Sequence, residues 1–174
     1  MKRVVIANII LATLALKGSS ARAGEYCAHP AATARSFLQA LQDKNLPGMS
    51  QLMTDEVRLA QPLTLTPQPA TYVGRATVEG YIGQVMAAFS TIFYSTIQLT
   101  EAKDGRSVFS QMVGNFVVAA NGNPYDNIYV MRLDFQRAAD GTCKVAGITE
   151  YFNPVIVACS LNATFAEFCD SIGR

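Results

Sequence analysis

The chain has 174 residues, of which 50% are hydrophobic and 16% are charged, with 14 Lys and Arg against 13 Asp and Glu. So much hydrophobic content with so little charge excludes a disordered chain, and the length suits one domain with a core of its own. A formal net charge of +1 leaves no basic excess to neutralise a phosphate backbone, which argues against nucleic acid as a partner.

The first 23 residues have the pattern of a cleaved signal peptide. A basic start is followed by an apolar run from Val4 to Leu16, which is too short to span a bilayer. Ala21-Arg22-Ala23 is a small-residue cleavage site, and we expect cleavage after Ala23; the alternative is an uncleaved anchor. Cleavage would remove four basic residues and no acid, leaving 10 basic against 13 acidic residues and a net charge of −3. The pattern therefore predicts a secreted or lumenal protein.

Three helices and one strand are predicted in the first half of residues 24–174. Apolar residues recur at spacings of three and four in the first and third helices, and Pro30 suits a first helical turn. A brief alternation of apolar and polar residues indicates a strand, and a proline-rich loop follows it. In chain order these elements are a helix at 30–44, a short helix at 49–53, the strand at 56–61, the loop at 62–69 and a helix at 74–89.

After residue 89 the sequence changes to four β-rich stretches separated by three short turns. The turns contain Asp104-Gly105, Asn121-Gly122 and Asp140-Gly141, which are typical of hairpins. Strands joined in this way form an antiparallel meander, so we expect an α+β fold with about three N-terminal helices on one face of a curved antiparallel sheet. Residues 24–174 contain no repeat or linker and are predicted to form a single domain. The four strands are 93–102, 107–119, 125–137 and 142–152.

Alternation along the last two strands places polar side chains on otherwise apolar faces. Glu150 is the notable case, because a carboxylate on an apolar face is costly to bury and its pKa should rise unless it is paired, as in a general base. Alternatively, Glu150 points to solvent, or it pairs with an arginine such as Arg132 and the face is plain core. The two faces are Asn127, Tyr129, Met131, Leu133 and Phe135, and Ala146, Ile148, Glu150 and Phe152.

Four cysteines follow the expected cleavage site. In an exported chain they indicate two disulfides, with three possible pairings, and zinc is a poor alternative because no C-x2-C pair occurs. We expect the tail at 158–174 to be pinned by its two cysteines. Asn162-Ala163-Thr164 is an acceptor triplet for N-glycosylation if the host is eukaryotic. The cysteines are Cys27, Cys143, Cys159 and Cys169.

A single histidine, His29, restricts the chemistry. Ser-His-Asp and Cys-His sites need a histidine held beside the nucleophile, whereas His29 lies just before the first predicted helix. The sequence has no G-x-S-x-G, P-loop, G-x-G-x-x-G or H-E-x-x-H motif. Carboxylates, tyrosines, amides and arginines remain, which indicates general acid–base chemistry without a cofactor or metal.

Three motifs resemble one family. Gly141-Thr142-Cys143-Lys144-Val145 followed by Glu150-Tyr151-Phe152-Asn153-Pro154 resembles the end of SnoaL-like domains, where a turn leads into a strand ending in EyfNP. Residues 125–130 resemble the preceding strand, and Tyr72-Val73-Gly74-Arg75 resembles the segment before a helix. The resemblance covers about residues 33–157 and identifies the SnoaL-like branch of the nuclear transport factor 2-like superfamily. It implies a cone-shaped sheet round helices with a deep apolar pocket.

The resemblance also implies acid–base chemistry by a carboxylate on the last strand. Thr149-Glu150-Tyr151-Phe152 is similar to the R-D-Y-F segment of limonene epoxide hydrolase-like members, so Glu150 takes the role of base by position. Those enzymes use an Arg-x-Asp on an earlier strand as the acid, and 107–119 has no acidic residue. Tyr81 and Tyr94 either line the pocket or belong to the core. The candidate proton donors are Asn115, Asn127, Tyr129 and Asp126, the last of which can instead be a turn residue.

These patterns predict a cofactor-independent enzyme of secondary metabolism that acts on an apolar polyketide or terpenoid. Epoxide hydrolysis or epoxide-opening cyclisation is the first interpretation, and SnoaL-type aldol cyclisation or isomerisation is the second. A non-catalytic small-molecule-binding module is an alternative of a different class. The expected partner is a hydrophobic small molecule, with no membrane span after signal cleavage, and the same cone can act as a homodimer.

Overall fold

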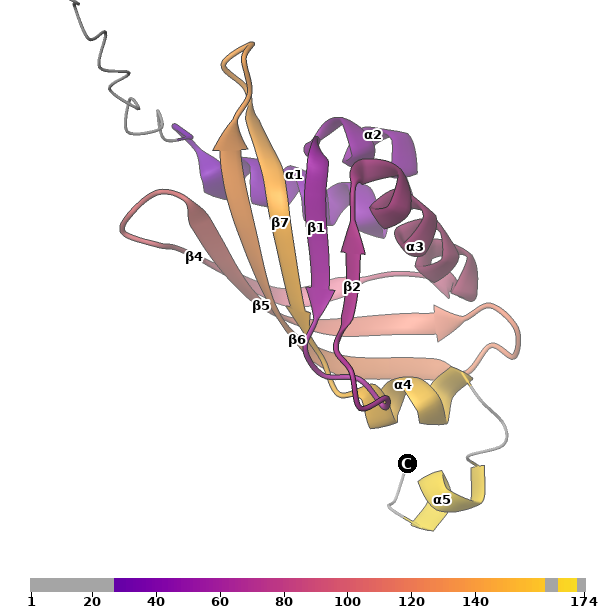
Figure 1. Cartoon of the computed structure of the whole chain (residues 1–174). Coiled ribbons are helices and arrows are strands. Elements are labelled where there is room, and N and C mark those ends of the chain that lie inside the picture. The colour runs from indigo at the N-terminus through magenta and orange to yellow at the C-terminus, as the bar shows by residue number, and fades with distance from the viewer. Residues whose placement is uncertain (1–26, 162–165, 172–174) are drawn as a thin grey trace, which may run out of the picture.

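A computed structural model describes residues 27–161 and 166–171 of the chain. The predicted signal peptide and Asn162 lie outside the described residues. Figure 1 shows an α+β molecule in which a curved sheet carries helices on its concave side. The helices are α1 (Pro30–Gln42), α2 (Leu46–Gln51), α3 (Arg75–Ala88), α4 (Pro154–Leu161) and α5 (Ala166–Ser171). The strands are β1 (Met53–Gln61), β2 (Ala70–Val73), β3 (Phe89–Thr91), β4 (Tyr94–Glu101), β5 (Ser107–Val118), β6 (Pro124–Arg137) and β7 (Cys143–Tyr151).

The three N-terminal helices are confirmed, with changed ends. α1 buries the predicted apolar face and ends at Gln42, because Lys44 adopts a left-handed backbone conformation with φ of 54°. α2 begins at Leu46 and not at 49, because the Asn45 side chain accepts a hydrogen bond from the Gly48 N–H at 3.0 Å and caps the helix. Pro47 therefore lies in the first turn of α2, where its missing N–H costs nothing.

The predicted antiparallel meander is present as β4 to β7, and the sheet is larger than the sequence indicated. Its strand order is β2-β1-β7-β6-β5-β3, and β4 also pairs with β5. β1 lies parallel to β7, so the expectation of a wholly antiparallel sheet is wrong at this pairing. The short strands β2 and β3 were not predicted, because neither is long enough to show an alternating pattern.

Register shifts bend the sheet and change one predicted face. β6 and β7 pair Asp134 with Gly147 and then Phe135 with Val145, which leaves Ala146 as an extra residue. Val145 therefore takes the inward position that alternation assigned to Ala146, and Val145 and Ile148 are both buried. The inward face predicted for β6 is confirmed, since Asn127, Tyr129, Met131, Leu133 and Phe135 are all buried.

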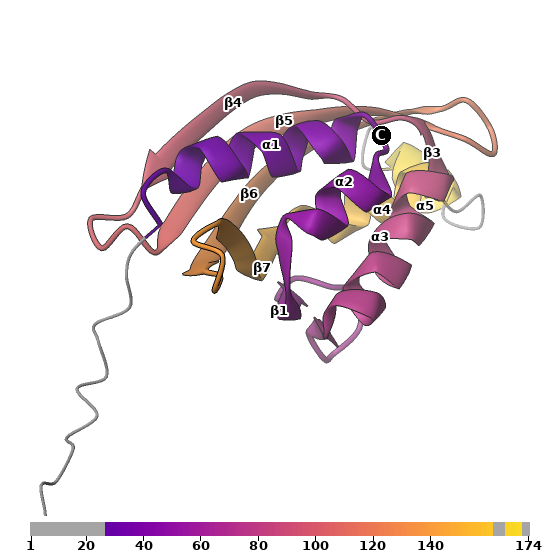
Figure 2. The ribbon, with the colours of Figure 1, turned by 90° about the horizontal axis from the view of Figure 1, so that it is seen from above.

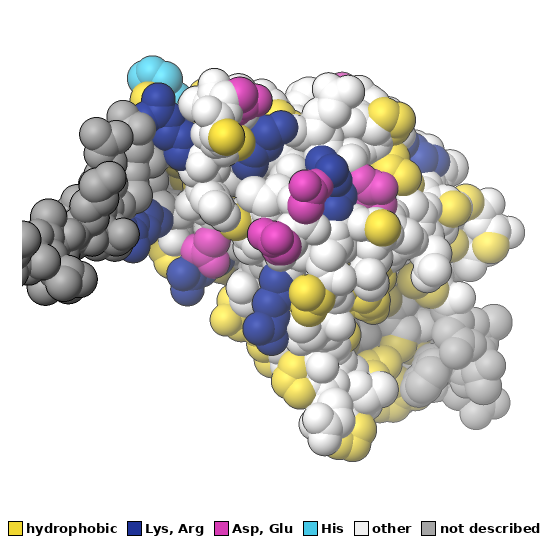
Figure 3. Space-filling view, turned by 45° about the horizontal axis from the view of Figure 1, so that its top comes forward, with side chains coloured by type: hydrophobic (Ala, Val, Ile, Leu, Met, Phe, Trp, Pro, Cys, Tyr) yellow, Lys and Arg dark blue, Asp and Glu magenta, His cyan; other side chains and the backbone are white. Residues whose placement is uncertain are grey.

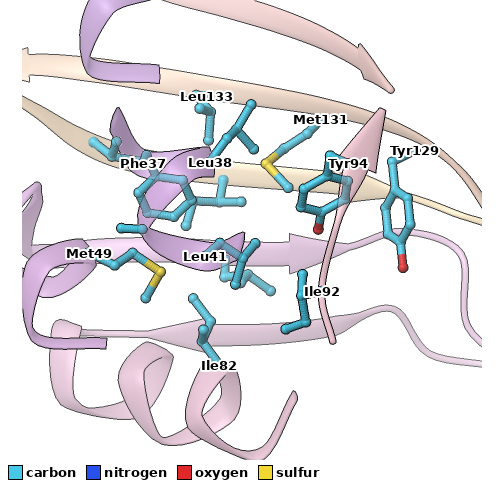
Figure 4. Packing of buried hydrophobic residues seen from close by; sticks show 14 of the residues in the cluster. Phe37, Leu38, Leu41, Met49, Ile82, Ile92, Tyr94, Tyr129, Met131 and Leu133 are labelled. Carbon is cyan, nitrogen blue, oxygen red and sulfur yellow. The ribbon is translucent and has the colours of Figure 1, made fainter. Parts of the chain in front are cut away.

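Helices α1 to α3 cover the concave face, as the view from above in Figure 2 shows, and α4 lies at one open end of the cone. Buried residues of α1, α2 and α3 pack against the inner faces of the strands (Figure 4). On the face in Figure 3, Lys and Arg are interspersed with Asp and Glu, so neither sign gathers there. Within the described ranges, no helix combines the length and apolar character needed to cross a bilayer.

Two disulfides are present, as the cysteine count predicted. Cys27 pairs with Cys143 across 116 residues, and Cys159 pairs with Cys169 across 10 residues. The first ties the start of the described chain to the start of β7, and the second ties α4 to α5. Residues 158–161 belong to a helix that begins at Pro154, so the segment predicted as a tail starts inside a folded element.

Candidate functional site

A cavity of about 290 Å³ lies on the concave side of the sheet, at the lower end of the range of roughly 300–1,000 Å³ typical of ligand pockets. Aliphatic and aromatic side chains make most of its wall. Among the described residues that line it, Glu150 is the only one with a charged side chain. The wall consists of Phe37, Leu41, Leu59, Tyr81, Ile82, Gln84, Val85, Ala88, Phe89, Tyr94, Phe116, Tyr125, Tyr129, Met131, Ile148, Glu150, Phe152, Val157 and Leu161.

Glu150 reaches the cavity from the end of β7, where the alternation with buried Ile148 directs it inward. Burial raises the pKa of Glu150 above its ordinary value, because a low-dielectric wall disfavours the carboxylate. A hydrogen bond from Gln61 opposes this rise in part, with Gln61 Nε2 donating to Glu150 Oε2 at 2.8 Å. Glu150 is thus a half-buried carboxyl group that accepts a hydrogen bond from one amide, a setting suited to a general base.

Arg132 does not neutralise this carboxylate. Its Nε donates to Asp134 Oδ1 at 2.8 Å, and its strand position is opposite Thr149, on the other face of the sheet from Glu150. The alternative in which Glu150 pairs with Arg132 inside a plain core is therefore wrong.

Two tyrosine hydroxyl groups form a pair in the same cavity. The Tyr125 and Tyr129 hydroxyls are 2.6 Å apart, and Asn127 Nδ2 donates to the Tyr125 oxygen at 2.9 Å. One hydroxyl proton joins the two oxygens, so the other is left to donate, whichever tyrosine carries it. Burial raises the pKa of Tyr125 to about 12 and moves the pKa of Tyr129 well above its usual value. Both groups remain protonated at physiological pH, and the pair can act as a hydrogen-bond donor.

Tyr81 and Tyr94 both line the cavity, while Tyr94 also belongs to the buried core and Tyr81 packs against that core, so both interpretations of these residues apply. The Tyr81 oxygen accepts a hydrogen bond from Gln61 Nε2, so a single amide contacts both this phenol and Glu150. Burial, followed by the nearby Glu150 charge, raises the pKa of Tyr81 and of Tyr94. Figure 4 shows the hydroxyls of Tyr94 and Tyr129 pointing to the same side of the sheet.

Asn127 is buried, but its side chain is already occupied. Besides the bond to Tyr125, its Nδ2 donates to the Asn153 carbonyl at 3.0 Å, and its Oδ1 accepts from the Asn153 N–H at 3.2 Å. Both amide protons are used, so Asn127 positions Tyr125 and the start of α4 and has no N–H left for a ligand.

Asn115 and Asp126 are not brought to the cavity. They are directly opposite each other on β5 and β6, and Asn115 Nδ2 donates to Asp126 Oδ1 at 2.9 Å. Ser95 donates to Asn115 Oδ1 at 2.8 Å from β4. Their neighbours Phe116 and Tyr125 point into the cavity, so alternation turns Asn115 and Asp126 to the convex face. Asp126 lies within β6, and the interpretation of it as a turn residue is also wrong.

Three residues of the site were missed, and the sequence contained a signal for two of them. Gln61 continues the inward alternation of Val57 and Leu59, and Tyr125 continues that of Asn127 and Tyr129. Gly114 is a third, because a Cβ at this position would lie 2.7 Å from Cε2 of Tyr129. A residue without a side chain is therefore needed for the Tyr129 ring to lie where it does.

Among the described residues, no group of three or more His, Cys, Asp or Glu side chains could hold a metal ion. The fold and cavity define a class: a conical α+β protein that encloses a small apolar site with one carboxyl group. The chain belongs to the SnoaL-like domain family, whose model matches residues 34–148. The match ends before Glu150, so the assignment of this residue depends on the geometry of the cavity. No curated protein sequence is similar enough to this chain to count as a match.

Solved structures share the fold at low sequence identity. A nuclear transport factor 2-like protein from Burkholderia xenovorans is 16% identical, with a TM-score of 0.61 over 80% of this chain and 100% of that one. A protein from Xanthomonas campestris, provisionally named a polyketide cyclase, is 19% identical, with a TM-score of 0.61 over 77% and 97%. A ketosteroid isomerase-like protein from Erwinia carotovora is 19% identical, with a TM-score of 0.59 over 74% and 96%. At these identities the likeness shows the nuclear transport factor 2-like fold alone.

Proposed function

We propose that the protein is a cofactor-independent acid–base enzyme that isomerises or cyclises an uncharged, apolar carbonyl compound. The observation that carries this proposal is a half-buried carboxyl group, Glu150, in the same apolar cavity as a tyrosine pair with a spare hydroxyl proton. With no cationic side chain among the described lining residues, the cavity disfavours carboxylates and phosphates and suits neutral ligands.

In this mechanism Glu150 removes a proton from the carbon next to the carbonyl, and the carbonyl oxygen becomes an enolate oxygen. The spare hydroxyl of the Tyr125–Tyr129 pair donates a hydrogen bond to that oxygen. Glu150 then returns its proton to a different carbon, which completes an isomerisation. In an aldol ring closure the enolate carbon attacks a second carbonyl, and the proton held by Glu150 passes to the new alkoxide oxygen. Each proton removed is returned, so no other reagent is needed.

The electrostatics of the site support these roles. A base works best when its pKa lies near the operating pH, and burial moves the pKa of Glu150 in that direction. A donor must keep its proton, and the pKa of both tyrosines is raised. The names of the two enzyme-like neighbours, a provisional polyketide cyclase and a ketosteroid isomerase-like protein, agree with chemistry of this kind. We propose a polyketide or terpenoid as the substrate class.

Epoxide opening is the second candidate. Glu150 would activate a water molecule, and the spare tyrosine hydroxyl would protonate the epoxide oxygen. The tyrosine pair favours this candidate, since it supplies a proton donor that the sequence motif lacked. Its weakness is that Asp126, the one carboxylic acid among the four candidate proton donors, lies on the convex face, so that only one carboxyl group lines the cavity among the described residues.

We also propose that the protein is exported. Two disulfides are compatible with an oxidising compartment, where such bonds persist. The signal peptide, the single domain at 24–174 and the homodimer stay predictions.

The test uses purified, disulfide-intact protein and two panels of neutral compounds, cyclic enones with 1,3-diketones and matched epoxides. Proton transfer is followed by NMR as hydrogen–deuterium exchange at carbon in D₂O, and epoxide loss is followed by chromatography. We expect exchange catalysed by the wild-type protein, and a loss of about 10²–10⁴-fold in Glu150→Gln with ligand binding retained. Glu56→Gln, an exposed carboxylate on β1, is the matched control and should exchange at the wild-type rate.

Three results would contradict the proposal or redirect it. Equal exchange by Glu150→Gln and wild type would remove Glu150 from the chemistry. Epoxide loss without exchange would favour the second candidate. Binding of neutral ligands with no turnover in either panel would favour a non-catalytic binding module.

A further inference from the structure

Helix α4 forms part of the cavity wall at its outer rim. Val157 and Leu161 both line the cavity, and they are four residues apart, so they lie on one face of the helix. Leu161 is also 42% exposed. A side chain that lines a cavity and is partly open to solvent stands at the mouth, where the length of a bound ligand is limited.

The start of α4 is fixed from the sheet. Asn127 holds the backbone of Asn153 through two hydrogen bonds, of 3.0 and 3.2 Å. Asn153 Oδ1 in turn accepts a hydrogen bond from the Val155 N–H at 3.0 Å, which caps the first turn. The same Asn127 side chain donates to Tyr125, so the position of α4 is linked to the tyrosine pair.

The end of α4 is joined to α5 by a covalent bond. Cys159 lies in its last turn and is joined to Cys169 of α5. A helix of eight residues is too short to be stable alone in water, so its last turn depends on such attachments. The last turn is also the part that carries Leu161.

We propose that α4, secured by the Cys159–Cys169 disulfide, is the specificity-determining wall of the cavity and that Leu161 sets the longest ligand that fits. This inference rests on the proposed function in one respect, that the cavity takes a neutral apolar molecule. It makes no use of the chemistry of Glu150, and it is tested by binding, so its failure is distinguishable from that of the proposed reaction.

Size selection follows from close packing. A cavity wall packed at the density of a protein interior cannot move by the size of one methylene group without strain. One methylene more or less on a ligand in an apolar pocket therefore changes the discrimination between ligands by roughly tenfold or more. Replacing Leu161 by Ala lengthens the cavity at its mouth, and replacing it by Trp shortens it. The two variants should therefore shift the preferred ligand length in opposite directions.

The first experiment measures Kd for a series of 2-alkanones from 2-hexanone to 2-dodecanone, by displacement of a neutral naphthyl ketone fluorophore. For Leu161→Ala we expect the ratio of affinities, long over short, to rise about tenfold, and for Leu161→Trp to fall by a similar factor. Leu65→Ala is the matched control, since Leu65 is exposed and does not line the cavity, and it should keep the wild-type ratio. Equal ratios in all four proteins would overturn the proposal.

The second experiment compares the two disulfides. The double variant Cys159→Ser with Cys169→Ser should raise the ratio of affinities, long ligand over short, as Leu161→Ala does. The reason is that the last turn of α4 is released. Cys27→Ser with Cys143→Ser is the control: Cys143 lies seven residues before Glu150 on β7, roughly 20 Å along the strand. The Cys27–Cys143 disulfide closes a longer loop than Cys159–Cys169, so its loss should lower the unfolding temperature more. The affinity ratio should stay at the wild-type value. Two results would overturn the role of the Cys159–Cys169 disulfide. One is an affinity ratio that changes in both double variants in proportion to the fall in unfolding temperature, and the other is an affinity ratio that changes in neither.

Discussion

The two faces of the β5–β6 pair carry similar polar residues with different consequences. On the concave face Tyr125, Asn127 and Tyr129 are buried and joined by hydrogen bonds. On the convex face Asn115 and Asp126 form a hydrogen bond of similar length, 2.9 Å, beside exposed Ile128. A polar group enclosed by apolar walls interacts with its neighbours far more strongly than one next to water. We therefore expect changes to the polar groups of the concave face to affect activity more than changes to those of the convex face.

Of the variants that test this comparison, the one that alters the tyrosine pair on the concave face should lower kcat most. The double variant Tyr125→Phe with Tyr129→Phe removes both hydroxyls of the buried donor pair, and we expect kcat to fall by about 10²–10³-fold, as for the loss of one donor to a developing oxyanion. The measurement is the proton exchange assay with the best carbon acid found for the wild-type protein. A fall of the same size in Asn115→Ala, on the convex face, would contradict the distinction between the faces.

A smaller effect is expected from Gly114, which lies against the Tyr129 ring on the concave face. In Gly114→Ala the new methyl group would meet the Tyr129 ring, so either the ring or the strand must move. We expect a loss of about 1–3 kcal/mol in the free energy of unfolding, as in overpacked cores, together with reduced exchange activity. Urea denaturation gives the first quantity. Gly80→Ala in α3, where an added Cβ meets nothing within 4 Å, is the control and should not lose stability.

The pH dependence of stability should distinguish the half-buried carboxyl group of Glu150 from the exposed one of Glu56. Burial raises the pKa of Glu150, so the folded protein retains a proton that the unfolded chain has already released. The stabilising contribution is therefore complete below the ordinary carboxyl pKa and is lost as pH rises through the raised value. We expect Glu150→Gln to unfold at a higher temperature than wild type by a margin that grows with pH in this range. A margin that is constant with pH, or that also appears in Glu56→Gln, would be inconsistent with this account.

The smallest effect is expected on the convex face. Asn115→Ala and Asp126→Asn alter a hydrogen bond at the surface, and such changes usually stay within about 0.5 kcal/mol. Exchange activity and ligand affinity should remain at wild-type values in both variants. A large loss of activity in Asp126→Asn would restore Asp126 as a candidate proton donor.

Much of the site could be predicted from strand alternation. The inward faces of Tyr129 and Glu150 follow from neighbours that are clearly apolar. β5 offered no such guide, because Phe109 and Val113 on one face and Val108 and Met112 on the other are all apolar. Asn115 was therefore assigned by resemblance and lies on the wrong face for a cavity residue. Ala146 was misplaced for another reason, since a bulge is an extra residue that alternation cannot anticipate.

The sequence alone determined what depends on near neighbours. Helical spacing, hairpin turns and the number of cysteines predicted three helices, a four-stranded meander and two disulfides, since these signals extend over only a few residues. The tertiary structure decided which distant residues meet. Gln61 and Glu150 are 89 residues apart and come together because β1 lies beside β7, and Cys27 finds Cys143 across 116 residues. Such pairings depend on how the whole sheet curves round its core. The same curvature places Glu150 among apolar side chains, and this burial raises its pKa.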